Sequence, residues 1–211
     1  MEIHPPTHPI LSVREFLVHL SMVTIGILIA LGLEQTVEAW HHHELGIEAR
    51  ENILNEIRDN KQKVDRARPL VAKNKEALRS SLATLRLYLA HKPPKHGEMP
   101  IPVSGPTLST TSWTTASTTG TLSYMGYAET KRFAGAYQVQ AVLQHAEDEM
   151  IQSAVQAFSL AGVNPDGPAG MREDQLRDLE RQLSSALGDV VFFDQLAEQL
   201  SREYSRVLQT K

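Results

Sequence analysis

The sequence predicts an all-α protein. In this fold an N-terminal transmembrane helix continues into a helical stalk and then into an antiparallel bundle of three helices, or four if a short helix is counted. Three observations predict it. An uncharged apolar stretch lies near the N-terminus, and apolar residues recur at heptad spacing through most of the remaining chain. The stretch with the most sheet-like composition, near Trp113, lacks sustained alternation of polar and apolar residues.

Composition excludes several classes of function. A net charge of −4 argues against a nucleic-acid-binding protein, so we expect no nucleic acid among the partners. The chain contains no cysteine, which excludes disulfides, thiolate zinc sites and cysteine nucleophiles. It also lacks the glycine patterns of P-loop, Rossmann and Gly-x-Ser-x-Gly sites. We therefore predict no catalytic residue and no cofactor, and we expect that the protein is not an enzyme.

The first two segments are a short tail, residues 1–10, and a transmembrane helix, residues 11–33. Pro9 prevents the helix from starting earlier, and residues 16–33 carry no formal charge. Those uncharged residues make about 27 Å of helix, close to the roughly 30 Å of a bilayer core. A cleaved signal peptide, with Ala30-Leu31-Gly32 as its cleavage site, and a buried core helix are the alternatives.

Residues within and around this helix predict how it sits. Gly26 and Ala30 lie four apart on one face, a spacing that permits close approach of another helix, although chance alone often produces it. Arg14 precedes the span, whereas Arg50 is the only Lys or Arg among the twenty residues after Leu33. The positive-inside rule then places the N-terminus in the cytoplasm and the bulk of the chain across the membrane.

The next helix is expected to run to about Ala90. Residues 34–53 form an acidic stalk, and the bundle domain occupies residues 54–211, with loops at 92–110 and 162–171. Pro69 predicts a kink at about residues 66–69. One heptad position is apolar throughout, with members Ile57, Val64, Val71, Leu78 and Leu85. We assign the companion position to Ile47, Leu54, Lys61, Arg68, Lys75, Leu82 and Leu89.

The basic middle of that companion position has two interpretations. Lys61, Arg68 and Lys75 either bind a partner protein or pair with acids such as Glu180 and Glu198 within the bundle.

Beyond the proline-rich loop, a short helix is expected over residues 111–122 and a long helix over residues 127–161. The final helix, residues 172–209, has an unbroken 3,4 pattern of apolar residues. Its members are Leu176, Leu179, Leu183, Ala186, Val190, Phe193, Ala197, Leu200, Tyr204 and Val207. In the predicted layout the proline-rich loop lies at the tip far from the membrane, and the Asn164 loop turns back towards the membrane.

Two histidine clusters suggest chemistry at first sight. His41, His42 and His43 are adjacent and point about 100° apart on a helix, so they cannot converge on one ion. They fit an interfacial belt with Trp40 better. His145, beside three acids, is more typical of a solvated helix face than of an acid–base pair. No metal site is therefore predicted.

Two segments resemble a group of uncharacterised bacterial single-pass membrane proteins. They are EFLVHLSMVTIGILIALGLEQTVEAWHHH and, after a charged helix, SWTTASTTGTLSYMGYAETKRFAGAYQVQ. The group shares an apolar span running into a Leu-Glu-Gln helix, and a pattern matched here by Trp113, Ala116, Thr119, Gly120 and Tyr137. The resemblance covers about half the chain. It implies a bacterial membrane location, and it carries over neither an activity nor a catalytic residue. We expect the inner membrane, with the N-terminus in the cytoplasm and the bulk of the chain in the periplasm.

The leading functional hypothesis is a membrane-anchored helical scaffold or accessory subunit that acts through protein–protein interaction. Its expected partners are the lipid bilayer and another membrane or membrane-proximal protein, or a second copy of itself. One alternative is a ligand-sensing bundle that signals through a separate partner, and another is a metal-dependent enzyme.

Overall fold

The computed structural model describes residues 13–92, 99–101, 105–162 and 166–209, and about nine tenths of these are helical. The long helices are α1 (Val13–Leu89), α3 (Tyr127–Gly162) and α4 (Glu173–Gln209). The short helix α2 (Thr111–Thr118) and two 3₁₀ turns, η1 (Thr121–Tyr124) and η2 (Gly167–Gly170), lie between them. No strand occurs among the described residues, so the all-α bundle predicted from the sequence is confirmed.

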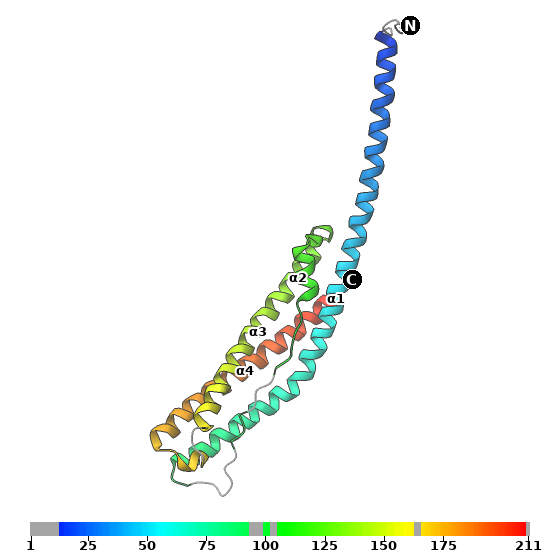
Figure 1. Cartoon of the computed structure of the whole chain (residues 1–211). Coiled ribbons are helices and arrows are strands. Elements are labelled where there is room, and N and C mark those ends of the chain that lie inside the picture. The colour runs from blue at the N-terminus through cyan, green and yellow to red at the C-terminus, as the bar shows by residue number, and fades with distance from the viewer. Residues whose placement is uncertain (1–12, 93–98, 102–104, 163–165, 210–211) are drawn as a thin grey trace, which may run out of the picture.

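Helix α1 links the apolar N-terminal segment to the bundle without interruption, and it continues through Pro69 (Figure 1). Residues 13–41 are exposed along their whole length. This part of α1 contains a stretch long and apolar enough to cross a membrane, and none of that stretch is buried against the rest of the chain. Apolar side chains exposed on every side of a helix are what a lipid environment accommodates and water does not.

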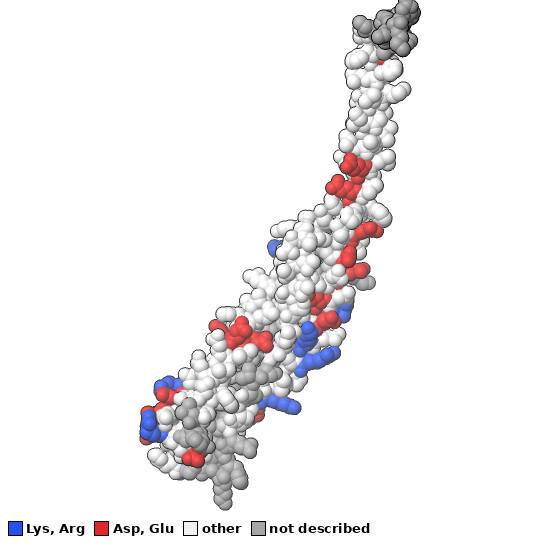
Figure 2. All heavy atoms as spheres, in the orientation of Figure 1, with Lys and Arg blue, Asp and Glu red and all other residues white. Residues whose placement is uncertain are grey.

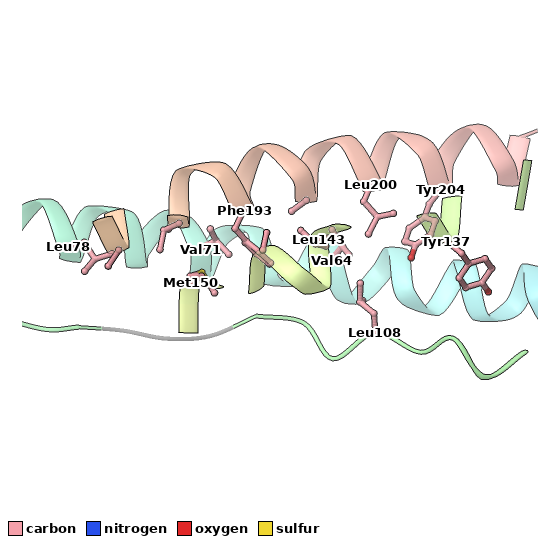
Figure 3. Close-up of a cluster of buried hydrophobic side chains, with 14 of the residues drawn as sticks. Val64, Val71, Leu78, Leu108, Tyr137, Leu143, Met150, Phe193, Leu200 and Tyr204 are labelled. Atoms are coloured by element: carbon pink, nitrogen blue, oxygen red, sulfur yellow. The ribbon is translucent and has the colours of Figure 1, made fainter. Parts of the chain in front are cut away.

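The core of the bundle forms where α4 lies between α1 and α3. All ten apolar positions predicted for the last helix are buried, from Leu176 to Val207. Figure 3 shows Phe193 and Leu200 of α4 directed towards Val64 of α1 and Leu143 of α3. The 3,4 pattern of α4 is therefore a genuine core seam, since each of its members loses contact with water.

One of the two seam positions predicted for α1 is confirmed and the other is wrong. Ile57, Val64, Val71, Leu78 and Leu85 are all buried. The companion position of the seam is one residue earlier than predicted, at Ile53, Asn60, Asn74 and Ser81. Of the predicted companions only Leu82 is buried, and Ile47 is 45% exposed. Counting apolar residues missed this register because three of the four true members are polar.

Only part of the apolar pattern of α3 faces the core. Phe133 and Tyr137 are buried, together with the small residues Ala136, Ala146, Ala154 and Ala157. Val155 and Phe158 are more than half exposed. Alanines allow α3 to approach α4 closely, so the larger apolar side chains are left on the outer face.

The direction of α3 differs from the predicted layout. Along α1 and α4 the ion pairs run in opposite order, from Arg86 with Glu180 to Lys75 with Asp194, so these helices are antiparallel. Along α1 and α3 the contacts run in the same order, from Arg50 with Glu129 onwards, so these two are parallel. The loop after α3 therefore lies at the tip far from the apolar segment (Figure 1), not on the membrane side as predicted.

A strap, defined here as residues 99–101 and 105–110, makes this parallel arrangement possible. It begins near the far tip, where Ser81 Oγ donates a hydrogen bond to the Pro100 carbonyl at 3.0 Å. It reaches Asn60 at Ser109, whose backbone N–H donates to Asn60 Oδ1 at 2.9 Å. The two contacts on α1 are about 31 Å apart at 1.5 Å per residue. The nine peptide units between Pro100 and Ser109 reach roughly 30 Å when extended, so the connection has the required length.

Charge is distributed in zones along the molecule (Figure 2). Below its first turn the upper part of α1 is uncharged, acidic side chains follow beneath this stretch, and basic side chains gather further along the bundle. The acidic zone of α1 is not a free stalk over its whole predicted range of 34–53. From His42 onwards it is in contact with η1, so the isolated part of α1 ends near residue 41.

Candidate functional site

A buried carboxylate lies at the end of the bundle nearest the apolar segment. Glu56 of α1 is only 8% exposed. Its oxygens accept hydrogen bonds from the Tyr137 hydroxyl at 2.6 Å, the Ser109 hydroxyl at 2.6 Å and the Ser112 backbone N–H at 2.9 Å. The Trp113 N–H lies 3.4 Å away. One carboxylate thus holds together α1, the strap, α2 and α3.

The surroundings of Glu56 keep it ionised. Burial alone would raise the pKa of the carboxyl group, but the hydrogen bonds from Ser109, Tyr137, Ser112 and Trp113 outweigh burial and lower it. Burial and the adjacent Glu56 charge raise the pKa of Tyr137, so its hydroxyl keeps its proton. Glu56 therefore stays deprotonated and Tyr137 stays protonated, which suits a structural anchor better than a proton-transfer pair.

Local sequence explains why α2 needs this carboxylate. Thr110 at the N-cap makes no side-chain capping hydrogen bond. The first N–H groups of a helix require acceptors and favour negative charge. Glu56, distant in sequence, supplies both, and the Trp113 ring stacks on Tyr137 with centroids 5.1 Å apart. The Thr-rich segment therefore folds as a helix because of its docking site.

A second set of polar groups joins the same end of the bundle. The Ser109 carbonyl accepts hydrogen bonds from Asn60 Nδ2 at 2.7 Å and from Gln140 Nε2 at 2.9 Å. Asn60 Nδ2 also lies 3.3 Å from Gln140 Oε1, and the Tyr204 hydroxyl donates to that oxygen. We call Glu56, Asn60, Ser109, Tyr137, Gln140 and Tyr204 the polar centre. It satisfies both backbone groups of Ser109, the N–H through Asn60 and the carbonyl through Asn60 and Gln140.

An open groove of about 500 Å³ adjoins the polar centre between α1, α2 and η1. One wall presents Glu48 and Asn52, and the other presents the hydroxyl-bearing side chains of α2 and η1. The full lining is Leu45, Glu48, Ala49, Asn52, Thr111, Ser112, Thr115, Ala116, Thr119, Thr121 and Tyr124. Glu48 is the one charged residue of this lining, so the groove favours a cationic or hydrogen-bonding occupant.

A glycine contact closes the upper end of the groove. Gly46 of α1 is buried, and a Cβ at this position would lie 2.8 Å from the Tyr124 carbonyl oxygen. One turn earlier, the His42 ring stacks on the Tyr124 ring with centroids 4.1 Å apart. Only glycine lets η1 approach α1 this closely, which fixes the width of the groove.

We expect Gly46→Ala to destabilise the packing of η1 by about 1–3 kcal/mol, because the added Cβ forces the two backbones apart. Hydrogen exchange of residues 119–127 would report the loss. Gly188→Ala is the matched control, because that helical glycine has open space around it and should gain roughly 0.5–1 kcal/mol from helix propensity. Equal effects at the two positions would contradict the packing argument.

Glu56 predicts an acid-sensitive docking of α2. A pKa below the ordinary 4.5 means that its stabilisation is complete above that value and is lost as the pH falls through the lowered pKa. Glu56→Gln should weaken docking by about 2 kcal/mol at pH 7, because charged hydrogen bonds are replaced by neutral ones.

The measurement uses Trp113 fluorescence in a Trp40→Phe background, since these are the two tryptophans of the chain. Wild-type protein should keep the docked signal at pH 4.5 and above, and lose it only as the pH falls through the lowered pKa of Glu56. The Glu56→Gln protein should show no such step, and a step of the same size in both proteins would assign the transition to other carboxyl groups.

The three basic residues singled out from the sequence do not share one environment. Lys75 Nζ lies 2.7 Å from Asp194 Oδ2, and Arg68 lies 3.6 Å from Glu198. Lys61 pairs along its own helix with Asp65. Two of the three therefore pair across to α4, and one does so with an acid named from the sequence.

Changing Lys61, Arg68 and Lys75 together to Gln should lower the melting temperature by roughly 2–4 °C, as expected for partly exposed pairs worth about 1 kcal/mol in total. The control changes Lys63, Arg66 and Lys73 to Gln, three exposed residues of the same helix without a cross-helix ion pair among the described contacts. An equal melting temperature for both triple variants would show that the pairs with α4 do not stabilise the bundle.

The remaining residues noted from the sequence lie apart. Gly26 has nothing within 4 Å of a Cβ position, and Ala30 is exposed. His145 faces Glu149 on an exposed surface. Within the described ranges, no three His, Asp or Glu side chains gather to hold a metal ion. Of the aromatic residues near the short helix, Trp113 and Tyr137 stack, whereas Tyr127 is 83% exposed.

Sequence reasoning missed Glu56, Asn60 and Gln140. A signal was present, because Asn60 is seven residues after Ile53 and Ser81 is seven after Asn74, in phase with the seam. A search for apolar residues passes over such positions. Comparison with protein-family models, curated proteins and solved structures finds no match for this chain.

Proposed function

We propose that this protein is a membrane-anchored helical scaffold or accessory subunit that acts by binding another protein near the membrane. The observation that carries the proposal is the uninterrupted course of α1 from its apolar segment to the groove. Because α1 is continuous, it would hold the groove at a fixed distance from the membrane. The groove residues Leu45 to Asn52 lie about 18–29 Å beyond Leu33 at 1.5 Å per residue. A device that presents a binding surface at a fixed height requires this geometry.

The proposed compartment follows from charge. Arg14 lies before the span, and acidic residues dominate directly after it. These features support a cytoplasmic N-terminus, and in the bacterial inner membrane expected from the resemblance the bundle would lie in the periplasm.

The proposed occupant of the groove is a protein segment that carries a basic side chain. Glu48 supplies a carboxylate at one wall, and the amide of Asn52 and the facing hydroxyls supply hydrogen bonds. Tyr124, 41% exposed, offers a ring edge or face beside them. The groove is partly open to solvent, which suits a side chain presented by a partner's loop.

Copurification from native membranes tests this function. Thr115→Trp fills the groove, whereas Thr114→Trp places the same side chain on α2 outside the groove lining. A stoichiometric partner should remain with wild-type and Thr114→Trp protein and fall at least about tenfold with Thr115→Trp, which corresponds to about 1.4 kcal/mol. Glu48→Gln should weaken retention of the same partner. The proposal would be overturned if no partner is retained, or if the partner is retained equally by wild-type, Thr115→Trp and Glu48→Gln protein.

A ligand-sensing bundle is the second candidate, favoured by the size of the same groove. A volume of about 500 Å³ lies within the range of small-molecule sites. The ligand would be cationic or rich in hydroxyl groups. Native mass spectrometry of detergent-purified protein would reveal it as a bound small molecule lost in Thr115→Trp, in place of a protein partner.

A further inference from the structure

A second heptad stripe runs along the part of α1 that the bundle leaves uncovered. Its members are Val23, Gly26, Ala30, Leu33, Val37, Trp40, Glu44 and Ile47, at spacings of three and four. All eight are exposed, and Trp40 is exposed by 64%. Figure 1 shows α1 standing away from the bundle up to about residue 41, and the last two members of the stripe lie at the height of η1. The stripe is distinct from the core seam, whose first buried hydrophobic residue is Ile53.

We infer that this stripe binds a second copy of the chain in parallel and in register. The inference rests on the membrane placement in the proposed function and names a partner for the anchor, separate from the occupant of the groove. A strict seven-residue repeat predicts a left-handed two-helix supercoil along the stripe. The small residues Gly26 and Ala30 would form its close-approach point within the bilayer.

Continuity across the membrane surface identifies the occupant. Gly26 and Ala30 precede the end of the apolar segment, whereas Val37, Trp40 and Ile47 follow it on the same face. A partner that covers both halves must itself be a helix that leaves the bilayer at the same place. A second copy satisfies this requirement, since insertion to the same depth aligns every residue of the stripe with its counterpart. Burial of Val37, Trp40 and Ile47 from water favours the association.

Charge at the stripe is compatible with this register. Glu44 interrupts the stripe, and Glu51 continues it one heptad later. In a parallel two-helix coiled coil, Glu44 and Glu51 would occupy the a position of the heptad. A residue at this position packs beside the residue at the preceding g position of the other helix. Glu44 would therefore lie beside His43 of the second copy, and Glu51 beside Arg50, which also pairs with Glu129 of its own chain. Arg50 of the second copy reduces the repulsion between the two Glu51 carboxylates, and the His43 ring offers Glu44 a hydrogen-bond donor.

The bundle does not obstruct the stripe. Gly46 and His42 face η1 on another side of the helix. At 100° per residue, Gly46 and its heptad equivalents Ala39 and Gly32 lie about 130° from the middle of the stripe. Two copies could thus meet along the stripe with their bundles directed outward.

Single-cysteine crosslinking in native membranes tests the inference, because the chain has no cysteine of its own. Val37→Cys lies on the stripe and Ala39→Cys lies away from it. Oxidation should give a disulfide-linked pair of this chain with a yield at least about fivefold higher for Val37→Cys. Equal yields at both positions, or a disulfide to a different protein instead of a second copy, would overturn the inference.

A second pair of variants tests continuity into the span. In the Val37→Cys background, Gly26→Ile should reduce the crosslink about fivefold, because a branched side chain separates the backbones. Gly32→Ile is the same change on the other side of the same helix and should leave the yield within about twofold. An undiminished crosslink with Gly26→Ile would overturn the inference.

The groove and the stripe can fail independently. Thr115→Trp should leave the Val37→Cys crosslink unchanged, and Gly26→Ile should leave the groove's partner bound. If only the crosslinking experiment fails, the proposed function is unaffected. If only the groove-dependent copurification fails, the inference of self-association is unaffected.

Discussion

A chain that begins at Glu34 is expected to leave the membrane fraction and to remain in solution as a folded helical bundle. The truncation removes the exposed apolar part of α1, which makes no contact with the bundle. Its roughly 20 apolar residues supply most of the affinity for the hydrocarbon core. The core residues from Ile53 onwards all remain.

Fractionation by centrifugation, followed by circular dichroism of the supernatant, measures this outcome. The full-length chain is the control and should leave the pellet only with detergent. A truncated chain that stays in the pellet and is released by detergent with its helicity intact would refute the assignment of the anchor. A pellet that detergent does not dissolve would indicate aggregation through an exposed apolar face, such as Val155 and Phe158.

Phe193→Asp is expected to unfold the bundle. The Phe193 side chain is fully buried between the helices, so the substitution places an unpaired carboxylate in an apolar core (Figure 3). The expected loss exceeds about 4 kcal/mol, a large part of the stability of a typical domain. Leu183→Asp, also fully buried on α4, should behave in the same way.

The neighbouring residue provides the control. Phe192 is 49% exposed, so Phe192→Asp makes the same chemical change on the same helix without burying a charge. Thermal unfolding of the full chain in detergent, followed by circular dichroism, should show a normal transition for Phe192→Asp and none for Phe193→Asp. A cooperative transition of wild-type position for Phe193→Asp would mean that the α4 seam is not the core.

The sequence alone determined the elements that depend on local periodicity. The ten buried residues of α4 follow from an unbroken 3,4 pattern, because a helix buries one face and that face must be apolar. Ile57 to Leu85 on α1 follow from the same rule. The apolar segment before Glu34 follows from its length and lack of charge. These features can be predicted without knowing which segments of the chain pack against them.

Only the tertiary structure decided how the chain returns from the far tip. A strap that crosses the length of the bundle must satisfy its own backbone groups, and Asn60, Gln140 and Ser81 do so from core-facing positions. This requirement makes α3 parallel to α1 and puts polar residues into the seam of α1. It also lets Glu56 cap a helix that begins more than fifty residues later. No local pattern specifies such partners, because hydrogen bonds between distant segments leave no periodicity in the sequence.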